Sequence, residues 1–164
     1  MRSISTTTDL DVPPDVAWAA LADFADHAAW NPFMVRLEGE PRVGSRLLVE
    51  LAPPGGRPMT FRPVVTAVEP GRRLQWLGHL GVRGLFDGRH DFLLDPLPEG
   101  RSRLTHSETF SGLLVPLVWR SMRDRTTAGF EAFNTAFARR CSVRANDRST
   151  GPKPTPSPSA VVPS

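Results

Sequence analysis

Apolar and polar residues alternate along much of the chain between positions 3 and 110, which is the pattern of strands with one buried face. Turn-forming residues such as Glu69-Pro70-Gly71 separate the alternating stretches. The pattern predicts seven strands, over residues 3–11, 34–41, 46–52, 59–68, 73–80, 85–94 and 103–110. Because the connections are short, we expect an antiparallel meander. Pro63 interrupts the fourth stretch and indicates a sheet edge or a bulge there.

Helical spacing replaces the alternation at two places. After the first strand, Pro13-Pro14-Asp15 predicts the start of a short helix, and a second short helix is expected over residues 26–30 because Asn31-Pro32 would end it. Residues 117–141 are expected to form a long helix whose apolar stripe faces the sheet. The stripe contains Trp119, Met122, Thr126, Phe130, Phe133 and Phe137, and the opposite side contains Arg120, Arg123, Asp124, Glu131 and Asn134.

The last two predicted strands place polar side chains on a face that is otherwise apolar. His90 shares its face with Phe92, and His106 shares its face with Glu108. If the connecting turn centres near Glu99, His90 lies opposite Glu108; if it centres one residue earlier, His90 lies opposite His106. Either register brings imidazole and carboxylate together. An unpaired buried carboxylate is costly, so we expect Glu108 to have a partner, a raised pKa or contact with water.

His90, His106 and Glu108 are therefore the candidate catalytic residues. A histidine and a carboxylate in a pocket can act as general acid and base on an enolisable carbonyl or a leaving hydroxyl group. The alternative is that these groups bond to one another and hold the sheet, or orient the polar head of a ligand. Their spacing fits no standard zinc pattern, and no glycine-rich phosphate loop precedes a helix, so we expect neither a metal nor a cofactor.

Composition and charge narrow the class of protein. The 164 residues, 40% of them hydrophobic, suffice for one domain, expected over residues 1–143. Residues 144–164 are expected to be a disordered tail because their Pro/Ser-rich end cannot build a core. The net charge of +3 comes without a basic stripe, so nucleic-acid binding is not expected. The single cysteine, Cys141, is expected to be an inert thiol.

The same sequence predicts no membrane span, because it contains no run of about 18 apolar residues. It shows no apolar signal segment at its beginning, so we expect a cytoplasmic protein, as a monomer or homodimer.

Several segments together resemble a known family. They are Val16-Ala17-Trp18, Trp30-Asn31-Pro32-Phe33, Leu74-Gln75-Trp76, Leu85-Phe86-Asp87-Gly88 with His90 and Phe92, then His106, Glu108, Phe110-Ser111-Gly112 and Gly129-Phe130. Over residues 3–141 the chain resembles the START-like superfamily, also called SRPBCC or Bet v 1-like, and within it the bacterial polyketide cyclase/dehydrase and lipid-transport-like proteins. The resemblance implies an α+β helix-grip fold, with a seven-stranded antiparallel sheet curved around a long C-terminal helix and two short helices after the first strand.

The resemblance also implies a ligand cavity between the sheet and the long helix. Its expected lining is Trp30, Phe33, Trp76, Phe86, Phe92, Phe110, Trp119, Met122 and Phe130. For any one of these residues, packing in a solid core is the more common explanation of its apolar character. We therefore expect a protein that binds a hydrophobic small molecule, such as a lipid, a polyketide or an aromatic metabolite. The alternatives are a polyketide aromatase/cyclase or dehydratase that uses the His/Glu group, and an interaction module whose cavity is vestigial.

Overall fold

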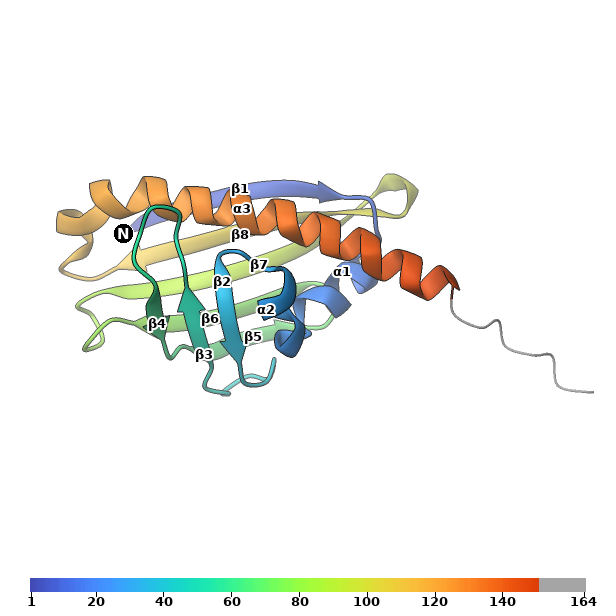
Figure 1. Cartoon of the computed structure of the whole chain (residues 1–164). Coiled ribbons are helices and arrows are strands. Elements are labelled where there is room, and N and C mark those ends of the chain that lie inside the picture. Colours follow the sequence, from blue (N-terminus) through green and yellow to red (C-terminus); the bar gives the residue numbers. More distant parts are fainter. Residues whose placement is uncertain (151–164) are drawn as a thin grey trace, which may run out of the picture.

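The computed structural model describes residues 1–150, with side chains up to residue 148. Its strands are β1 (Arg2–Leu10), β2 (Met34–Glu38), β3 (Leu48–Leu51), β4 (Met59–Phe61), β5 (Val64–Glu69), β6 (Arg73–His79), β7 (Asp87–Leu97) and β8 (Arg101–Ser111). Its α-helices are α1 (Pro14–Leu21), α2 (His27–Trp30) and α3 (Val115–Thr150), with 3₁₀ turns at Phe24–Asp26 and Pro98–Gly100. Figure 1 shows α3 running lengthwise along the long strands, while β2, β3 and β4 run across them.

The strands form two antiparallel sheets, so the prediction of one seven-stranded sheet is wrong in its strand count. Residues 1–150 contain a five-stranded sheet in the order β1-β8-β7-β6-β5 and a three-stranded sheet in the order β2-β3-β4. The stretch predicted as one strand over residues 59–68 breaks at Arg62-Pro63, and its halves, β4 and β5, join different sheets. The break follows from proline, which cannot donate a ladder hydrogen bond. The α+β class, the antiparallel order, the two short helices and the long C-terminal helix are confirmed.

The C-terminal helix covers the larger sheet with its aromatic stripe. Phe130, Phe133 and Phe137 are fully buried, so the predicted stripe forms the centre of the core. No helix within residues 1–150 combines the length and the apolar character needed to cross a membrane.

Helix α3 is longer than its hydrophobic periodicity predicts. It continues to Thr150, so residues 144–150, which we placed in the disordered tail, are helical. Arg144 bonds to Asp23 at 3.0 Å and Arg148 to Asp15 at 3.2 Å, so polar contacts hold the last turns against the first helices. The remaining part of the predicted tail, residues 151–164, lies outside the described residues.

Asn31 shapes the turn that leads from α2 into the smaller sheet. Its Oδ1 accepts hydrogen bonds from the backbone N–H groups of Phe33 (3.0 Å) and Met34 (2.9 Å). Its Nδ2 lies 3.2 Å from Nδ1 of His27, whose Nε2 lies 2.9 Å from the carbonyl oxygen of Leu21. The Asn31-Pro32 signal that ends α2 in the sequence thus also fixes the backbone from which Phe33 projects.

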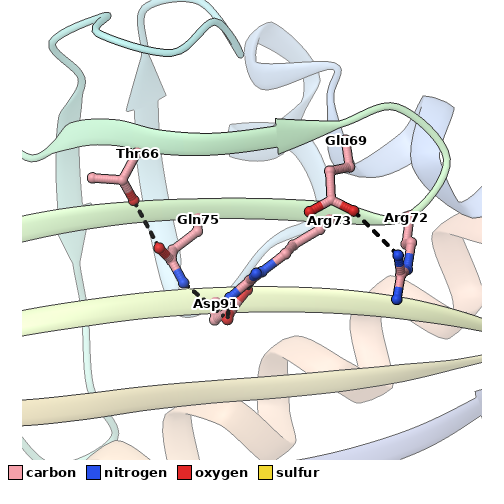
Figure 2. A network of polar contacts seen from close by, with 6 residues as sticks. All are labelled: Thr66, Glu69, Arg72, Arg73, Gln75 and Asp91. Atoms are coloured by element: carbon pink, nitrogen blue, oxygen red, sulfur yellow. Dashed lines mark hydrogen bonds and ion pairs between the residues drawn. The ribbon is translucent and has the colours of Figure 1, made fainter.

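The outer face of the larger sheet carries a polar cluster across β5, β6 and β7 (Figure 2). Arg73 makes a two-pronged contact with Asp91, at 3.0 and 2.7 Å, and Gln75 donates to the same carboxylate at 3.0 Å. Thr66 extends the cluster by donating to Gln75 at 3.0 Å. Because Asp91 lies between His90 and Phe92, this outer cluster helps to hold the register of the strands that carry the inner site.

Candidate functional site

A cavity of about 270 Å³ lies between the two sheets and the first half of α3. Its apolar lining is Phe33, Met34, Val49, Leu51, Pro53, Met59, Phe61, Pro63, Trp76, Leu80, Phe86, Phe110, Leu114, Val118 and Met122. Its remaining lining residues are Gly78, His79, Gly88, His90, Glu108 and Thr126. A mostly apolar wall with a few convergent polar groups is typical of small-molecule sites, although this cavity is at the small end of their range.

Five of the nine residues predicted to bind a ligand line this cavity, and four do not. The five are Phe33, Trp76, Phe86, Phe110 and Met122. The four that pack elsewhere are Trp30, Phe92, Trp119 and Phe130. Trp30 packs on Phe133 and Phe137, and Trp119 packs edge-on against Phe110. The sequence could not separate these two groups, because periodicity reports which residues are buried but not which of them border a void.

The cavity reaches the surface beside an apolar rim. Met59 and Leu80 line the cavity and are also exposed. Two further side chains are exposed nearby: Leu113 just before α3, and Leu117 in its first turn. The backbone joins the two regions, because the N–H groups of residues 113 and 114 donate to the carbonyl oxygens of residues 84 and 85. The rim therefore includes the β6–β7 connection, which is hydrogen-bonded to the segment just before α3.

Two glycines allow aromatic and acidic side chains to reach the cavity wall. A Cβ atom on Gly129 of α3 would overlap the ring of Phe33, so glycine lets that ring pack directly on the helix. A Cβ atom on Gly88 of β7 would overlap Oε1 of Glu108. The Glu108 carboxylate therefore lies over Gly88, and the space it occupies exists because residue 88 has no side chain.

The polar group on the cavity wall depends on the register of β7 and β8. The turn centres on Glu99, which adopts a left-handed conformation with φ of 63°. His90 consequently lies opposite Glu108, and Phe92 lies opposite His106, which is the first of the two registers that the sequence allows. Nδ1 of His90 is 3.6 Å from Oε2 of Glu108. This distance is longer than a hydrogen bond, and the contact becomes an ion pair only when His90 is protonated.

His106 lies behind His90 and does not line the cavity. Its ring is stacked on Phe130 with 3.8 Å between ring centroids, and on Phe92 at 4.5 Å. Nε2 of His106 is 2.6 Å from Nε2 of His90, which makes the two rings a hydrogen-bonded dyad. Of the three candidate catalytic residues, only His90 and Glu108 reach the cavity.

Sequence reasoning missed the residue that completes this group. Asn134, which we placed on the polar side of α3, is only 5% exposed. Its Oδ1 is 3.1 Å from Nδ1 of His106, and its Nδ2 donates to Oγ1 of Thr6 on β1 at 3.0 Å. A signal for its burial exists in the spacing, because Asn134 follows Phe130 by four residues and precedes Phe137 by three.

Burial sets the charge of two histidines in the core. The pKa of His106 is lowered well below its ordinary value, first by burial and then by the neighbouring charge of His90. Burial likewise lowers the pKa of His27 to about 4. Both rings are therefore neutral at neutral pH, and His27 is a structural histidine whose two nitrogens bond within the α2 region. His79 is exposed at the end of β6 and also lines the cavity.

Across residues 1–150, no three side chains of the His, Cys, Asp or Glu type are grouped as a metal site would require.

Burial raises the pKa of Cys141 to about 12, so this thiol stays protonated within the core.

A sheet gripping a long helix over a cavity defines the helix-grip class of fold, and known proteins place the chain within that class. The family model described as polyketide cyclase/dehydrase and lipid transport matches residues 1–142, so the chain belongs to this family, which is of the SRPBCC type. No curated protein matches the chain in sequence.

Several solved structures share the fold. The Zhui aromatase/cyclase from Streptomyces sp. R1128 has 16% identity and a TM-score of 0.73, over 88% of this chain and 95% of that one. Protein MLL2253 from Mesorhizobium loti has 20% identity and a TM-score of 0.67, and the match covers 87% of this chain and 98% of that one. Norcoclaurine synthase from Thalictrum flavum has 14% identity and a TM-score of 0.67, and the match covers 90% of this chain and 96% of that one. At such identities the likeness establishes the fold alone.

Proposed function

We propose that this protein binds an uncharged hydrophobic small molecule in the cavity between its two sheets and α3. The observation that carries the proposal is the cavity of about 270 Å³, whose wall is apolar apart from the His90–Glu108 pair, His79 and Thr126. Burial of a ligand of one or two rings against Phe33, Trp76 and Phe110 supplies the binding free energy. The description of the family, which includes lipid transport, agrees with this role.

Native mass spectrometry of the freshly purified protein tests the proposal. We expect a mass excess that disappears after extraction with organic solvent, and we expect the emptied protein to take up naphthalene. A protein that carries nothing and takes up neither naphthalene nor 2-naphthol would contradict a binding function.

A second candidate function is catalysis of cyclisation or dehydration, and the position of Glu108 favours it. Its side chain is 14% exposed, lines the cavity and lies 3.6 Å from His90. In a dehydration, the Glu108 carboxylate would take a proton from the carbon beside a carbonyl group. His90, protonated at Nδ1, would give a proton to the β-hydroxyl group, which leaves as water while the carbon–carbon double bond forms.

Substitution at Glu108 tests this second function separately from binding. Glu108→Gln removes the base and keeps the size of the side chain, so turnover of a β-hydroxyketone should fall at least about a hundredfold while binding remains. Unchanged turnover in Glu108→Gln would exclude Glu108 as the base.

A further inference from the structure

A continuous chain of polar contacts connects the surface strand β1 with the cavity. It begins at Thr6, passes through Asn134 on α3 to His106 on β8, and continues to His90 on β7 (3.0, 3.1 and 2.6 Å). It ends at Glu108, 3.6 Å beyond His90. Every other described contact of these rings is with an aromatic side chain, so the chain of polar contacts fixes where their protons lie.

The direction of each hydrogen bond in this chain follows from the hydroxyl group of Thr6. The hydroxyl group of Thr6 donates to the carbonyl oxygen of His106 at 3.4 Å, so its oxygen accepts from Nδ2 of Asn134. Oδ1 of Asn134 then faces Nδ1 of His106 and can only accept. His106 therefore carries its hydrogen on Nδ1, and its Nε2 is an acceptor.

The second ring is oriented by the first. Because Nε2 of His106 accepts, Nε2 of His90 must donate across the 2.6 Å contact. Nδ1 of His90 is then the nitrogen left for the cavity side, where it faces Oε2 of Glu108. In the neutral His90 ring this nitrogen is an acceptor, as are both oxygens of an ionised Glu108.

We propose that Asn134 is a positioning residue that sets the tautomers of His106 and His90 so that the cavity wall presents hydrogen-bond acceptors. The proposal rests on the binding function above and specifies its ligand, which is an uncharged molecule that donates a hydrogen bond from a hydroxyl group. None of the described lining residues is lysine or arginine, whose fixed positive charge would neutralise a ligand carboxylate. An anion would also meet Glu108 and is rejected.

Nitrogen-15 NMR of the imidazole rings tests the tautomers directly, because the chain has only four histidines. We expect hydrogen on Nδ1 of His106 and on Nε2 of His90. In Asn134→Leu, which keeps a similar volume but removes the acceptor, His106 should move its hydrogen to Nε2, since an unpaired buried N–H group is costly. An unchanged His106 tautomer in Asn134→Leu, or hydrogen on Nε2 in the unaltered protein, would overturn the proposal.

Thr6→Val provides a second variant in case Asn134→Leu does not fold. It removes the oxygen that orients the Asn134 amide, so the His106 tautomer should become mixed. Thr135→Val is the matched control, because its hydroxyl group bonds only to the carbonyl oxygen of Glu131 on the exposed side of α3. This control should leave both rings unchanged, and a shift as large as that of Thr6→Val would contradict the assigned chain.

Calorimetry with three probes of one ring system tests the ligand class. The unaltered protein should bind 2-naphthol about tenfold more tightly than naphthalene, and 2-naphthoate more weakly than either. In Asn134→Leu the preference for 2-naphthol should fall towards onefold while naphthalene binding persists. Equal binding of 2-naphthol and naphthalene by the unaltered protein would refute the proposal but leave the binding function intact. Failure of naphthalene and 2-naphthol to bind would refute the binding function, and the NMR result would still decide the tautomers.

Discussion

Nε2 of His90 and Nε2 of His106 lie 2.6 Å apart, although the two residues are not directly opposite each other in the sheet. His90 pairs with Glu108 and His106 pairs with Phe92, so the histidines are diagonal neighbours across β7 and β8. This diagonal lets one ring face the cavity while the other lies between Phe92 and Phe130. The dyad thus joins a solvent-accessible site to the buried core.

Gly88→Ala should displace the Glu108 carboxylate from the cavity wall, because the added methyl group would overlap Oε1 of Glu108. Denaturant titration should show a loss of about 1–3 kcal/mol of unfolding free energy, and the preference for 2-naphthol should fall. The matched control is Gly78→Ala on the paired strand, where a Cβ atom meets Pro63 at an ordinary 3.5 Å. Its unfolding free energy should change by less than about 0.5 kcal/mol, and equal losses in both variants would contradict the placement of Glu108.

Acidification should destabilise the fold through its two neutral buried histidines. Burial lowers the pKa of His27 to about 4 and that of His106 well below 6.5, whereas both rings titrate near 6.5 in the unfolded chain. Below pH 6.5 the unfolded state therefore binds more protons than the folded state. The stabilisation of the fold by the neutral histidines is complete above about pH 6.5 and is lost as the pH falls towards 4. For His27 alone, the unfolding free energy falls by about 3 kcal/mol.

Chemical unfolding at a series of pH values measures this dependence. His27→Gln should lower the slope of unfolding free energy against pH between 4 and 6.5, and His79→Gln, which changes an exposed ring, serves as the control. If His27→Gln kept the full slope, the neutral buried state of His27 would be wrong.

Cys141 should be protected from thiol reagents in the folded protein. Its side chain is 1% exposed, and burial raises its pKa from 9.0 to about 12, which lowers the reactive thiolate fraction about a thousandfold. Reaction with a disulfide reagent such as DTNB should be slow in buffer and fast in guanidinium chloride. Rapid stoichiometric reaction of the folded protein would contradict the burial of this thiol.

Much of the fold could be predicted because apolar alternation and helical spacing report burial directly. The turn between β7 and β8 could not, since Pro98-Glu99-Gly100 allows a centre at either of two positions and only the left-handed Glu99 selects one. The eighth strand was missed for a related reason, because Pro63 marks an interruption without showing that the chain changes sheets there.

The candidate site was predicted in part. His90 and Glu108 were candidates because polar and charged groups stand out on an apolar face, and both line the cavity. Asn134 was missed because its amide is counted as polar wherever it lies on a helix. The cavity itself was expected only from the family resemblance. Trp30, Phe92 and Phe130 have the same apolar pattern as Phe33 and Trp76, and only the packing shows which of them border the void.

The accessibility of the cavity to a hydrophobic ligand is the claim on which the other proposals depend. Val118 lines the cavity from α3, whereas its neighbour Leu117 is 78% exposed and does not line it. Val118→Trp should fill the void and Leu117→Trp should not, because adjacent residues of a helix project about 100° apart and only residue 118 faces the cavity.

Calorimetric titration of these two variants with naphthalene is the most direct measurement. We predict that Val118→Trp weakens binding at least about tenfold relative to the unaltered protein, while Leu117→Trp binds as the unaltered protein does. Equal affinity of both variants and the unaltered protein for naphthalene would show that the ligand lies elsewhere and would contradict the account.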